Sequence, residues 1–522
     1  MVVPDFLRAR VEASPDNPFL YFNDRVISFG DMARRSDRAA GLLESLGVRK
    51  GDKVCLMLSN RPEFLDLWFG LAKLCAVMVP LNTSLKGDGF AYIVNHSDAS
   101  VFVLESAFVP VFEKAAQELK NIRTKVFVGD KEGMPGGFVG YDEAVAAFPA
   151  GRTRRAVIQP SDVMSIMYTS GTTGLPKGAM ISHFNYPNTG KIWEEIVVRA
   201  NSDDVFFTTL PLFHANAQMF TTMGSVSSGR PMVLREKFSA SRFFDEIRQY
   251  GATVFNYIGA MLTILMKQPP RPDDADNPAR ITFGGAAPKE IWREFEKRFG
   301  VTIMEGFGLT ESGGVCLANP YDRIKVGSIG KPLPFCDVKV VDEYDVELPA
   351  GISGEIVVRT KVPDAIFLEY YKDSQRTQES MRGGWFHSGD RGYVDEEGYF
   401  YFLDRMKDCI RRRGENISSF EIEKAINAHP KVLESAAIGV PSELGEEDVK
   451  VFVVPREGSA LGPDEIVEWC ADRIAYFMVP RYIEFLEAFP KTATERTQKY
   501  ELRKRPPGVC WDREKKEFVK PC

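Results

Sequence analysis

The sequence predicts an α/β protein with a large N-terminal domain of layered sheets and helices and a smaller α+β domain at the C-terminal end. Its 522 residues exceed what one hydrophobic core usually holds. Short apolar runs alternate with amphipathic helical patterns through most of the chain, which is typical of sheets with many parallel strands. From about residue 325 this alternation changes to strands separated by glycine turns, which indicates a small β-rich subdomain.

The N-terminal part alternates strand and helix. Residues 53–58 predict a strand, and a helix is expected to begin near Pro62 and to run, buried, into a strand that ends by residue 80. Residues 100–105 predict a strand that a helix follows from Pro110. Further strands are predicted at 125–130, 205–211 and 253–259.

The C-terminal part predicts a domain of its own. Residues 338–360 indicate strand, turn and strand, and the clearest boundary follows residues 398–405, so we divide the chain into 1–403 and 404–522. Helices are expected at 419–430 and 464–477, and strands at 435–441 and 450–455.

Composition excludes several classes of protein. Hydrophobic residues make up 44% and charged residues 26% of the chain, as in folded globular proteins. The 66 basic and 72 acidic residues leave a net charge of −6, which gives no electrostatic reason to expect a nucleic acid or an anionic membrane as partner. No stretch approaches the roughly 18 uninterrupted apolar residues of a membrane span. Charges within residues 1–18 argue against a signal peptide.

The eight cysteines are scattered singly, without a CxxC pair. Zinc sites and disulfide frameworks usually need closely spaced cysteines, so we expect neither. The simplest interpretation is a cytoplasmic protein with reduced thiols.

Residues 167–183, MYTSGTTGLPKGAMISH, have the composition of a loop that holds phosphate. Hydroxyl side chains and glycine amides donate hydrogen bonds, and Lys177 adds positive charge. The spacing differs from a Walker A motif, in which the lysine directly follows the last glycine. The alternative is a flexible linker, but linkers seldom lie between an apolar strand, here 163–168, and a helical continuation.

Four further motifs follow in order: GGAAP at 284–288, EGFGLTES at 305–312, WFHSGDRG at 385–392 and DRMKDCIRRRGENIS at 404–418. With the phosphate loop, this set resembles the adenylate-forming superfamily of acyl-CoA synthetases, adenylation domains of peptide synthetases and firefly luciferase. The likeness spans nearly the whole chain. FNYIGAML, KQPPRPDDADNP and PKTATERTQKY resemble the crotonobetaine/carnitine-CoA ligase branch.

The resemblance implies an enzyme that uses Mg²⁺, ATP, coenzyme A and a small carboxylic acid. The carboxylate attacks the α-phosphate of ATP and releases pyrophosphate, and the thiol of coenzyme A then displaces AMP. The resemblance also implies that the C-terminal domain rotates between these steps about Lys407. By analogy the protein forms a homodimer.

The resemblance also assigns site residues. Glu311 is the expected Mg²⁺ ligand, Thr310 contacts the α-phosphate, Asp390 accepts the ribose hydroxyls, and Arg405 approaches the ribose and phosphate from the other side. The full set for nucleotide and coenzyme A is Thr169, Ser170, Gly171, Thr172, Thr173, Gly174, Lys177, Gly285, Ala286, Ala287, Pro288, Glu305, Gly306, Phe307, Gly308, Thr310, Asp390, Phe402, Arg405, Arg411 and Gly414.

The acid pocket is assigned to His214, Asn216, Tyr257, Gly259 and Gly285, with His214 as the gating side chain. If the acid carries a quaternary ammonium group, Tyr257 and Phe213 would be the walls of an aromatic cage. A fatty or aryl acid would need only apolar volume. The triple arginine 411–413 would contact coenzyme A phosphates, or be a solvated run of charge.

The chain departs from the superfamily near its end. Where a T-x-x-G-K motif supplies the adenylation lysine, this sequence reads KTATERTQK, with Arg496 at the lysine position and Lys499 three residues on. Arginine keeps the charge but is not interchangeable with lysine. Two alternatives stand beside an acid–CoA ligase. One is an enzyme that loads a carrier protein, and the other, suggested by the missing lysine alone, is a non-catalytic nucleotide- or acyl-binding protein.

Overall fold

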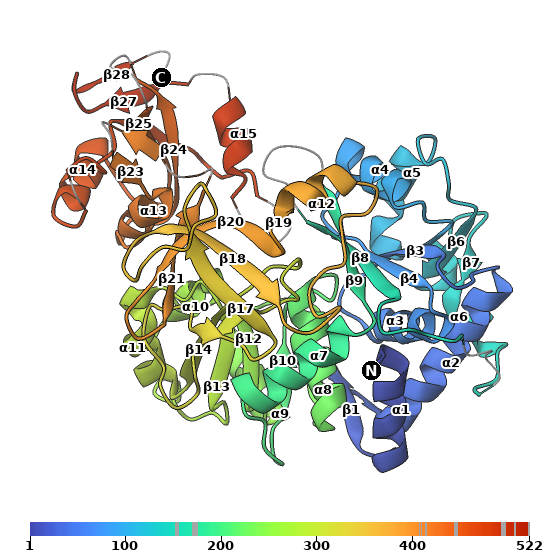
Figure 1. Cartoon of the computed structure of the whole chain (residues 1–522). Coiled ribbons are helices and arrows are strands. Elements are labelled where there is room, and N and C mark those ends of the chain that lie inside the picture. Colours follow the sequence, from blue (N-terminus) through green and yellow to red (C-terminus); the bar gives the residue numbers. More distant parts are fainter. Residues whose placement is uncertain are drawn as a thin grey trace. The chain divides into compact units, whose positions relative to one another are not determined.

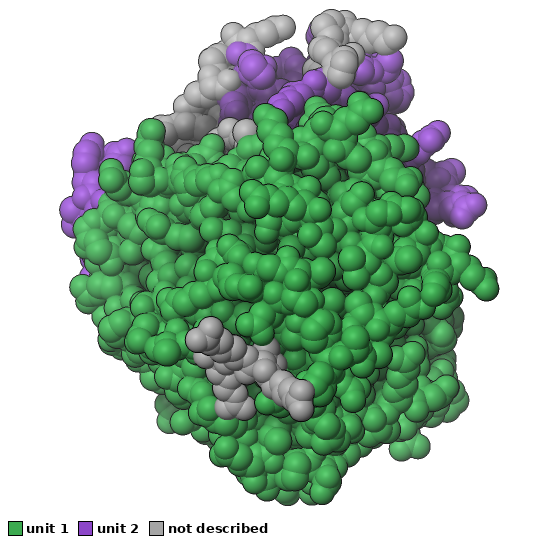
Figure 2. All heavy atoms as spheres, turned by 90° about the vertical axis from the view of Figure 1, so that its right-hand side faces the viewer, with its two compact units in different colours: residues 1–338, 358–387 green, residues 339–357, 388–522 purple. Residues whose placement is uncertain are grey.

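The computed structural model describes residues 1–522 except 152–155, 170–175, 407, 409, 413–414, 443–446, 475, 492–496, 506–507 and 520–522. Two compact units emerge: residues 1–338 with 358–387, and residues 339–357 with 388–522 (Figure 2). Residues 339–357 and 388–403 thus group with the C-terminal part. The domain boundary at residue 404 stays a prediction.

A nine-stranded sheet lies in the first unit and has the order β16-β15-β14-β13-β12-β10-β11-β1-β2 in the described residues (Figure 1). Its central pairs are parallel, and β1–β2, β14–β15 and β15–β16 are antiparallel. The strands are β1 (Pro18–Phe22), β2 (Arg25–Ser28), β10 (Phe206–Thr208), β11 (Met232–Leu234), β12 (Val254–Ile258), β13 (Ile281–Gly285), β14 (Thr302–Phe307), β15 (Leu317–Ala318) and β16 (Lys331–Pro332).

Helices and two short π-helical turns belong to the same unit. A π-turn is rare and recurs at functional sites, and η4 begins two residues after the predicted gating histidine, His214. The elements are α1 (Val3–Ala13), α7 (Asn185–Ile192), η3 (Trp193–Val197), η4 (Asn216–Thr222), α8 (Met223–Ser228), α9 (Phe243–Tyr250), α10 (Gly259–Met266) and α11 (Lys289–Phe299).

A seven-stranded sheet has the order β7-β6-β5-β3-β4-β8-β9. Its pairs are parallel except β8–β9. The strands are β3 (Lys53–Met57), β4 (Val77–Pro80), β5 (Val101–Glu105), β6 (Thr124–Val128), β7 (Val139–Gly140), β8 (Val163–Thr169) and β9 (Lys177–Ser182). The helices of this region are α2 (Phe29–Ser45), α3 (Pro62–Leu74), α4 (Gly87–His96), α5 (Val109–Ala115) and α6 (Tyr141–Ala146).

The strands and helices predicted for the N-terminal part are confirmed, but the helix expected after the phosphate loop is wrong. The chain continues as β9, whose Lys177 pairs with Thr169 of β8 in an antiparallel hairpin, and helix α7 begins only at Asn185. A side chain at Gly178 would come within 2.7 Å of the Ile166 side chain, so glycine allows the two strands to approach.

A third sheet has the order β17-β18-β20-β19, with β21 paired to β20. Its strands are β17 (Cys336–Val341), β18 (Gly354–Thr360), β19 (Met381–Arg382), β20 (Trp385–Val394) and β21 (Phe400–Arg405), and α12 (Ser374–Ser380) precedes β19. This confirms the strand–turn–strand prediction for residues 338–360.

The C-terminal part is α+β, as predicted. A sheet of order β24-β25-β26-β27-β28 shares an apolar core with α13 and α14 that includes Ile422, Val451 and Ile466. The elements are β22 (Ile410–Arg412), β23 (Glu415–Ile417), α13 (Ser419–Asn427), β24 (Val432–Pro441), β25 (Glu447–Pro455), α14 (Pro463–Ala471), β26 (Tyr482–Phe485), α15 (Lys499–Lys504), β27 (Cys510–Asp512) and β28 (Glu517–Val519).

The expectation of reduced thiols is only partly right. Cys55, Cys75, Cys316, Cys336 and Cys470 are free and buried, whereas Cys510 is disulfide-bonded. Within the described ranges, no helix is long and apolar enough to cross a membrane.

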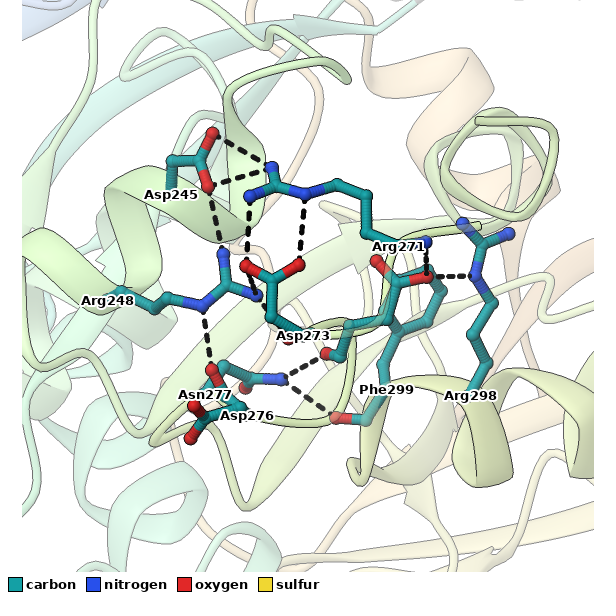
Figure 3. A network of polar contacts seen from close by, with 9 residues as sticks. Asp245, Arg248, Arg271, Asp273, Asp276, Asn277, Arg298 and Phe299 are labelled. Atoms are coloured by element: carbon teal, nitrogen blue, oxygen red, sulfur yellow. Dashed lines mark hydrogen bonds and ion pairs between the residues drawn. The ribbon is translucent and has the colours of Figure 1, made fainter. Parts of the chain in front are cut away.

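Ion pairs secure the segment that joins α10 to β13. Arg271 contacts Asp245 at 2.9 Å and Asp273 at 2.9 Å, and Arg298 contacts Asp274 at 2.7 Å (Figure 3). Arg248 of α9 also donates to Asp276 O at 2.7 Å. The proline-rich stretch that resembles the carnitine branch is therefore a loop held by arginines from α9, α11 and itself.

Candidate active site

The phosphate loop is anchored at both ends by the hairpin. Thr169 is the last residue of β8 and Lys177 is the first of β9, and the two are register partners. Ser170, Gly171, Thr172, Thr173 and Gly174 lie outside the described residues. The structure thus places the two ends of the loop beside each other.

Glu311 lies next to this hairpin, although it is distant in sequence. Its Oε1 accepts hydrogen bonds from Thr169 Oγ1 at 2.9 Å and from Tyr370 OH at 3.0 Å. The Lys177 ammonium lies 4.8 Å from the centre of the Tyr370 ring. Glu311 is only 6% exposed, so its carboxylate is a buried acceptor held by two hydroxyls.

Burial and charge act in opposite directions on Lys177. Desolvation lowers the pKa of its ammonium, while the nearby Glu311 opposes that shift. A polyphosphate would add the negative charge that favours the protonated form.

The donor set fits Mg²⁺. Magnesium prefers hard oxygen ligands and is commonly held by one or two carboxylates together with substrate phosphates and water. Glu311 supplies such a carboxylate, with Thr169 hydroxyl beside it. Among the described residues there is no group of three or more His, Cys, Asp or Glu side chains that could hold a metal without a ligand's help.

A buried carboxyl holds the GGAAP segment. Glu305 of β14 accepts hydrogen bonds from Ala286 N at 2.6 Å and Ala287 N at 3.0 Å, and Tyr257 OH donates to the same carboxyl. Ala286 has a φ of 66°, a left-handed conformation that a non-glycine residue adopts only under outside constraint. Burial raises the pKa of Glu305 to about 8, and these three donors act against that rise.

Glycines allow the backbone of this region to approach its neighbours. A side chain at Gly259 would come within 1.9 Å of Ala286 O, and one at Gly308 within 2.3 Å of Gly314 O. At Gly306 it would meet the Phe283 ring at 2.8 Å. These positions therefore tolerate no side chain without movement. Gly285, Pro288, Phe307 and Thr310 lie in the same two segments.

His214 lies on a loop held by two buried amides. Asn60 donates to Leu210 O at 3.0 Å and accepts from Leu212 N at 2.7 Å, and Gln218 of η4 donates to Leu212 O. The Nε2 of His214 is buried without a hydrogen-bond partner among the described residues. Burial lowers its pKa to about 4, so the ring is neutral at pH 7.

Asn216, Tyr257 and Gly259 are also predicted to line the acid pocket. Asn216 accepts a hydrogen bond from Asn256 at 2.7 Å. Tyr257 is 0% exposed, and its hydroxyl is engaged by Glu305. Gly259 begins α10. The wall of an aromatic cage would need an accessible ring face, which the burial of Tyr257 does not offer.

Asp390 and Arg405 are register partners on β20 and β21 of the second unit. Arg405 Nε lies 2.7 Å from Asp390 Oδ1, and Ser388 Oγ accepts from Asp390 N at 3.0 Å. Asp390 is 1% exposed. The two residues predicted to contact the ribose are thus an ion pair. Phe402 of β21 packs on Phe420 at 5.8 Å between ring centres.

Lys499 is engaged within the second unit. Its ammonium lies 2.8 Å from Glu423 Oε1 and donates to Ser419 Oγ at 2.6 Å. Burial raises the pKa of Glu423, and Lys499 opposes this shift by stabilising the carboxylate. Arg496, Lys407 and Gly414 lie outside the described residues, as does the side chain of Arg411.

The middle residue of the triple arginine is structural. Arg412 is 2% exposed, lies 2.9 Å from Asp448 and donates to Phe477 O at 2.8 Å. Arg412 is therefore neither part of a solvated run of charge nor available to contact coenzyme A. Sequence could not show this, because Asp448 comes from another strand.

The fold and these motifs define a class of protein, and family models agree with that class. A model of the AMP-binding enzyme matches residues 7–371, and a model of the AMP-binding enzyme C-terminal domain matches residues 421–496. The chain belongs to the AMP-binding enzyme family and is an acid–thiol ligase of its adenylate-forming acyl-CoA synthetases.

Two curated relatives of this chain have the same name. Crotonobetaine/carnitine–CoA ligase of Salmonella heidelberg (strain SL476) is 35% identical over 485 residues, 92% of this chain and 93% of that protein. The protein of the same name from Proteus mirabilis (strain HI4320) is 35% identical over 486 residues, with the same coverage of each chain.

Solved structures share the fold. The anthranilate CoA ligase AuaEII in complex with anthranoyl-AMP has a TM-score of 0.89 and 27% identity, and the match covers 97% of each chain. ATP-bound MatB from Rhodopseudomonas palustris has a TM-score of 0.85 and 26% identity, over 97% of this chain and 99% of that one.

Proposed function

We propose that the chain activates a betaine-type carboxylic acid with ATP and joins it to coenzyme A. The observation that carries this proposal is that Thr169 and Lys177, at the two ends of the phosphate loop, lie beside the Glu311 carboxylate in a member of this family. A screen for coenzyme A-dependent release of AMP tests it.

Lys177, Glu311 and His214 would each have a separate role in the two reaction steps. Lys177 would bind the phosphates that leave as pyrophosphate, and Glu311 would hold Mg²⁺, which neutralises charge on the phosphates. The acid's carboxylate oxygen forms a bond to the α-phosphorus as the bond to pyrophosphate breaks. In the second step the thiolate sulfur bonds to the acyl carbon, and AMP leaves with the electron pair of the broken C–O bond. Neutral His214 would border the acid.

We assign the adenylation cation to Arg496. Lys499 is already committed to Glu423 and Ser419, which supports the arginine. A guanidinium can stabilise the developing charge on the α-phosphate and the attacking carboxylate.

Arg496→Ala is expected to slow ATP–pyrophosphate exchange by at least about tenfold, because a group that stabilises the transition state is lost. Arg496→Lys should recover only part of the lost exchange, because lysine keeps the positive charge but not the planar fork of the guanidinium. Lys499→Ala serves as the comparison, and a loss confined to Lys499→Ala would transfer the role to that residue. If neither alanine variant slows exchange, the adenylation cation lies elsewhere.

The betaine class of acid is proposed because the curated relatives are named crotonobetaine/carnitine–CoA ligase. Short- and medium-chain acids and aryl acids are the competing substrates, since a structural neighbour is an anthranilate CoA ligase. The screen should therefore include betaines, fatty acids and aryl acids. A higher kcat/KM for a betaine than for an uncharged acid of equal length would support the betaine class.

Loading of a carrier protein and non-catalytic binding are not favoured. Thr310 and Glu311 are present, and the relatives that span more than nine-tenths of the chain are CoA ligases. We also propose a cytoplasmic location, where ATP and coenzyme A are supplied. Formation of a homodimer is a further prediction that size-exclusion chromatography with light scattering can test.

A further inference from the structure

We propose that Tyr370 is a positioning residue of the phosphate site, which orients the Glu311 carboxylate through its hydroxyl and holds the Lys177 ammonium on its ring. This inference rests on the proposed function, because it concerns how the same site binds Mg²⁺ and ATP. Tyr370 lies outside the sequence motifs that indicate the family.

The backbone fixes where Tyr370 lies. Residues around it pair with β9: Leu368 N donates to Met180 O at 2.8 Å, Met180 N to Glu369 O at 3.0 Å, and Tyr371 N to Gly178 O at 2.8 Å. Phe367 N donates to the backbone oxygen of Glu311 at 2.9 Å. The segment is thus attached both to the strand that begins with Lys177 and to Glu311 itself.

The hydroxyl completes the surroundings of one carboxylate oxygen. Oε1 of Glu311 accepts from Tyr370 OH at 3.0 Å and from Thr169 Oγ1 at 2.9 Å. Oε2 has no hydrogen-bond partner among the described residues. Outer groups that hydrogen-bond to a metal ligand commonly fix its orientation. Tyr370 and Thr169 therefore fix Oε1 and leave Oε2 as the oxygen available to a cation.

The aromatic ring of Tyr370 contacts the second charged group of the site, the Lys177 ammonium. The Lys177 ammonium lies 4.8 Å from the ring centre and has no ion pair with any residue that the structure describes. A cation–π contact stabilises a partly desolvated ammonium without neutralising it. The lysine thus keeps its charge for a phosphate, and it does not close onto Glu311.

The neighbouring tyrosine provides a matched comparison. Tyr371 OH donates to Asp98 at 2.8 Å, and Lys372 lies 2.5 Å from the same carboxylate. Lys53 lies 5.5 Å from the Tyr371 ring. Tyr371 therefore has the same kinds of contact as Tyr370, a carboxylate and a lysine, but with partners outside the proposed site.

Two variants separate the two contacts. Tyr370→Phe removes the hydroxyl and keeps the ring, whereas Tyr370→Leu removes both. In ATP–pyrophosphate exchange, Tyr370→Phe should raise the Mg²⁺ concentration for half-maximal rate by about tenfold, the size of effect usual for an outer partner of a metal ligand. Calorimetric titration with ATP in EDTA should give wild-type affinity for Tyr370→Phe and about fivefold weaker affinity for Tyr370→Leu, because only the latter loses the cation–π contact.

Tyr371→Phe and Tyr371→Leu are the controls and should match the wild type in both measurements. Thermal unfolding of all four variants checks that they are folded, and Tyr370→Phe conserves nearly all packing. The inference is overturned if Tyr370→Phe needs no more Mg²⁺ than the wild type, or if the two Tyr370 variants bind metal-free ATP equally. If the wild type and the variants bind ATP as predicted but no acid supports acyl-CoA formation, only the proposed function fails.

Discussion

At the scale of single residues, the site depends on buried groups whose partners are far away in the sequence. Glu305 illustrates this, because the resemblance implied only that it belongs to the residues for nucleotide and coenzyme A. Its carboxyl instead joins Tyr257 of β12 to Ala286 and Ala287 after β13. We interpret Glu305 as the residue that keeps Ala286 in its left-handed conformation.

Glu305→Gln should raise the KM for ATP by about tenfold, because an amide offers one acceptor oxygen where the carboxyl offered two and the loop is no longer held. Glu294→Gln, an exposed position on α11, is the control. Equal KM values for ATP in the two variants would contradict the role given to Glu305.

The second prediction for a single residue is that His183 makes the stability of the protein depend on pH. It is 0% exposed, and burial lowers its pKa to about 4. The unfolded chain binds a proton below the ordinary histidine pKa of about 6.5, whereas the folded chain does not until about pH 4. Stability from this residue is therefore complete above the unfolded pKa and is lost as pH falls toward 4.

Between pH 7 and pH 5 the free energy of unfolding should fall by about 2 kcal/mol on account of His183. His183→Phe should show a smaller fall. Urea unfolding at the two pH values measures this. A wild-type pH dependence in His183→Phe would refute the prediction.

At the scale of elements, several boundaries could be predicted and others could not. The β3 strand and the buried α3 helix follow from apolar runs and from the proline at the start of α3. The β8–β9 hairpin was missed, because residues 177–182 show too short a pattern to distinguish a strand from a helix without their partner. Tyr370 was missed for a related reason: in FLEYYKD the two tyrosines look alike, and only pairing with β9 separates them.

Gly259→Ala tests the close approach of α10 to the GGAAP segment. A methyl group would come within 1.9 Å of Ala286 O, so we expect a loss of about 2 kcal/mol or more in stability and a higher KM for ATP. Gly89→Ala on α4 is the control, since nothing lies within 4 Å of its added methyl group. Alanine there should stabilise the protein by about 0.5 kcal/mol. Equal unfolding midpoints for both variants would contradict the packing argument.

At the scale of the whole molecule, the fold class could be predicted because strand and helix patterns alternate along the chain. The family could be predicted because five long motifs occur in order. The pairing of Lys499 with Glu423, and of Arg412 with Asp448, could not be predicted, because each pair depends on how separate strands and helices pack. The hinge at Lys407 and the change of domain orientation remain predictions.

The central claim is that one molecule of acid, ATP and coenzyme A becomes one molecule each of acyl-CoA, AMP and pyrophosphate. Quenched single-turnover reactions with a betaine acid, read by mass spectrometry, measure all three products together. We predict equal amounts of acyl-CoA, AMP and pyrophosphate, and none of them with Glu311→Ala. Release of ADP and phosphate, or AMP without acyl-CoA in the presence of coenzyme A across the whole acid screen, would contradict the account.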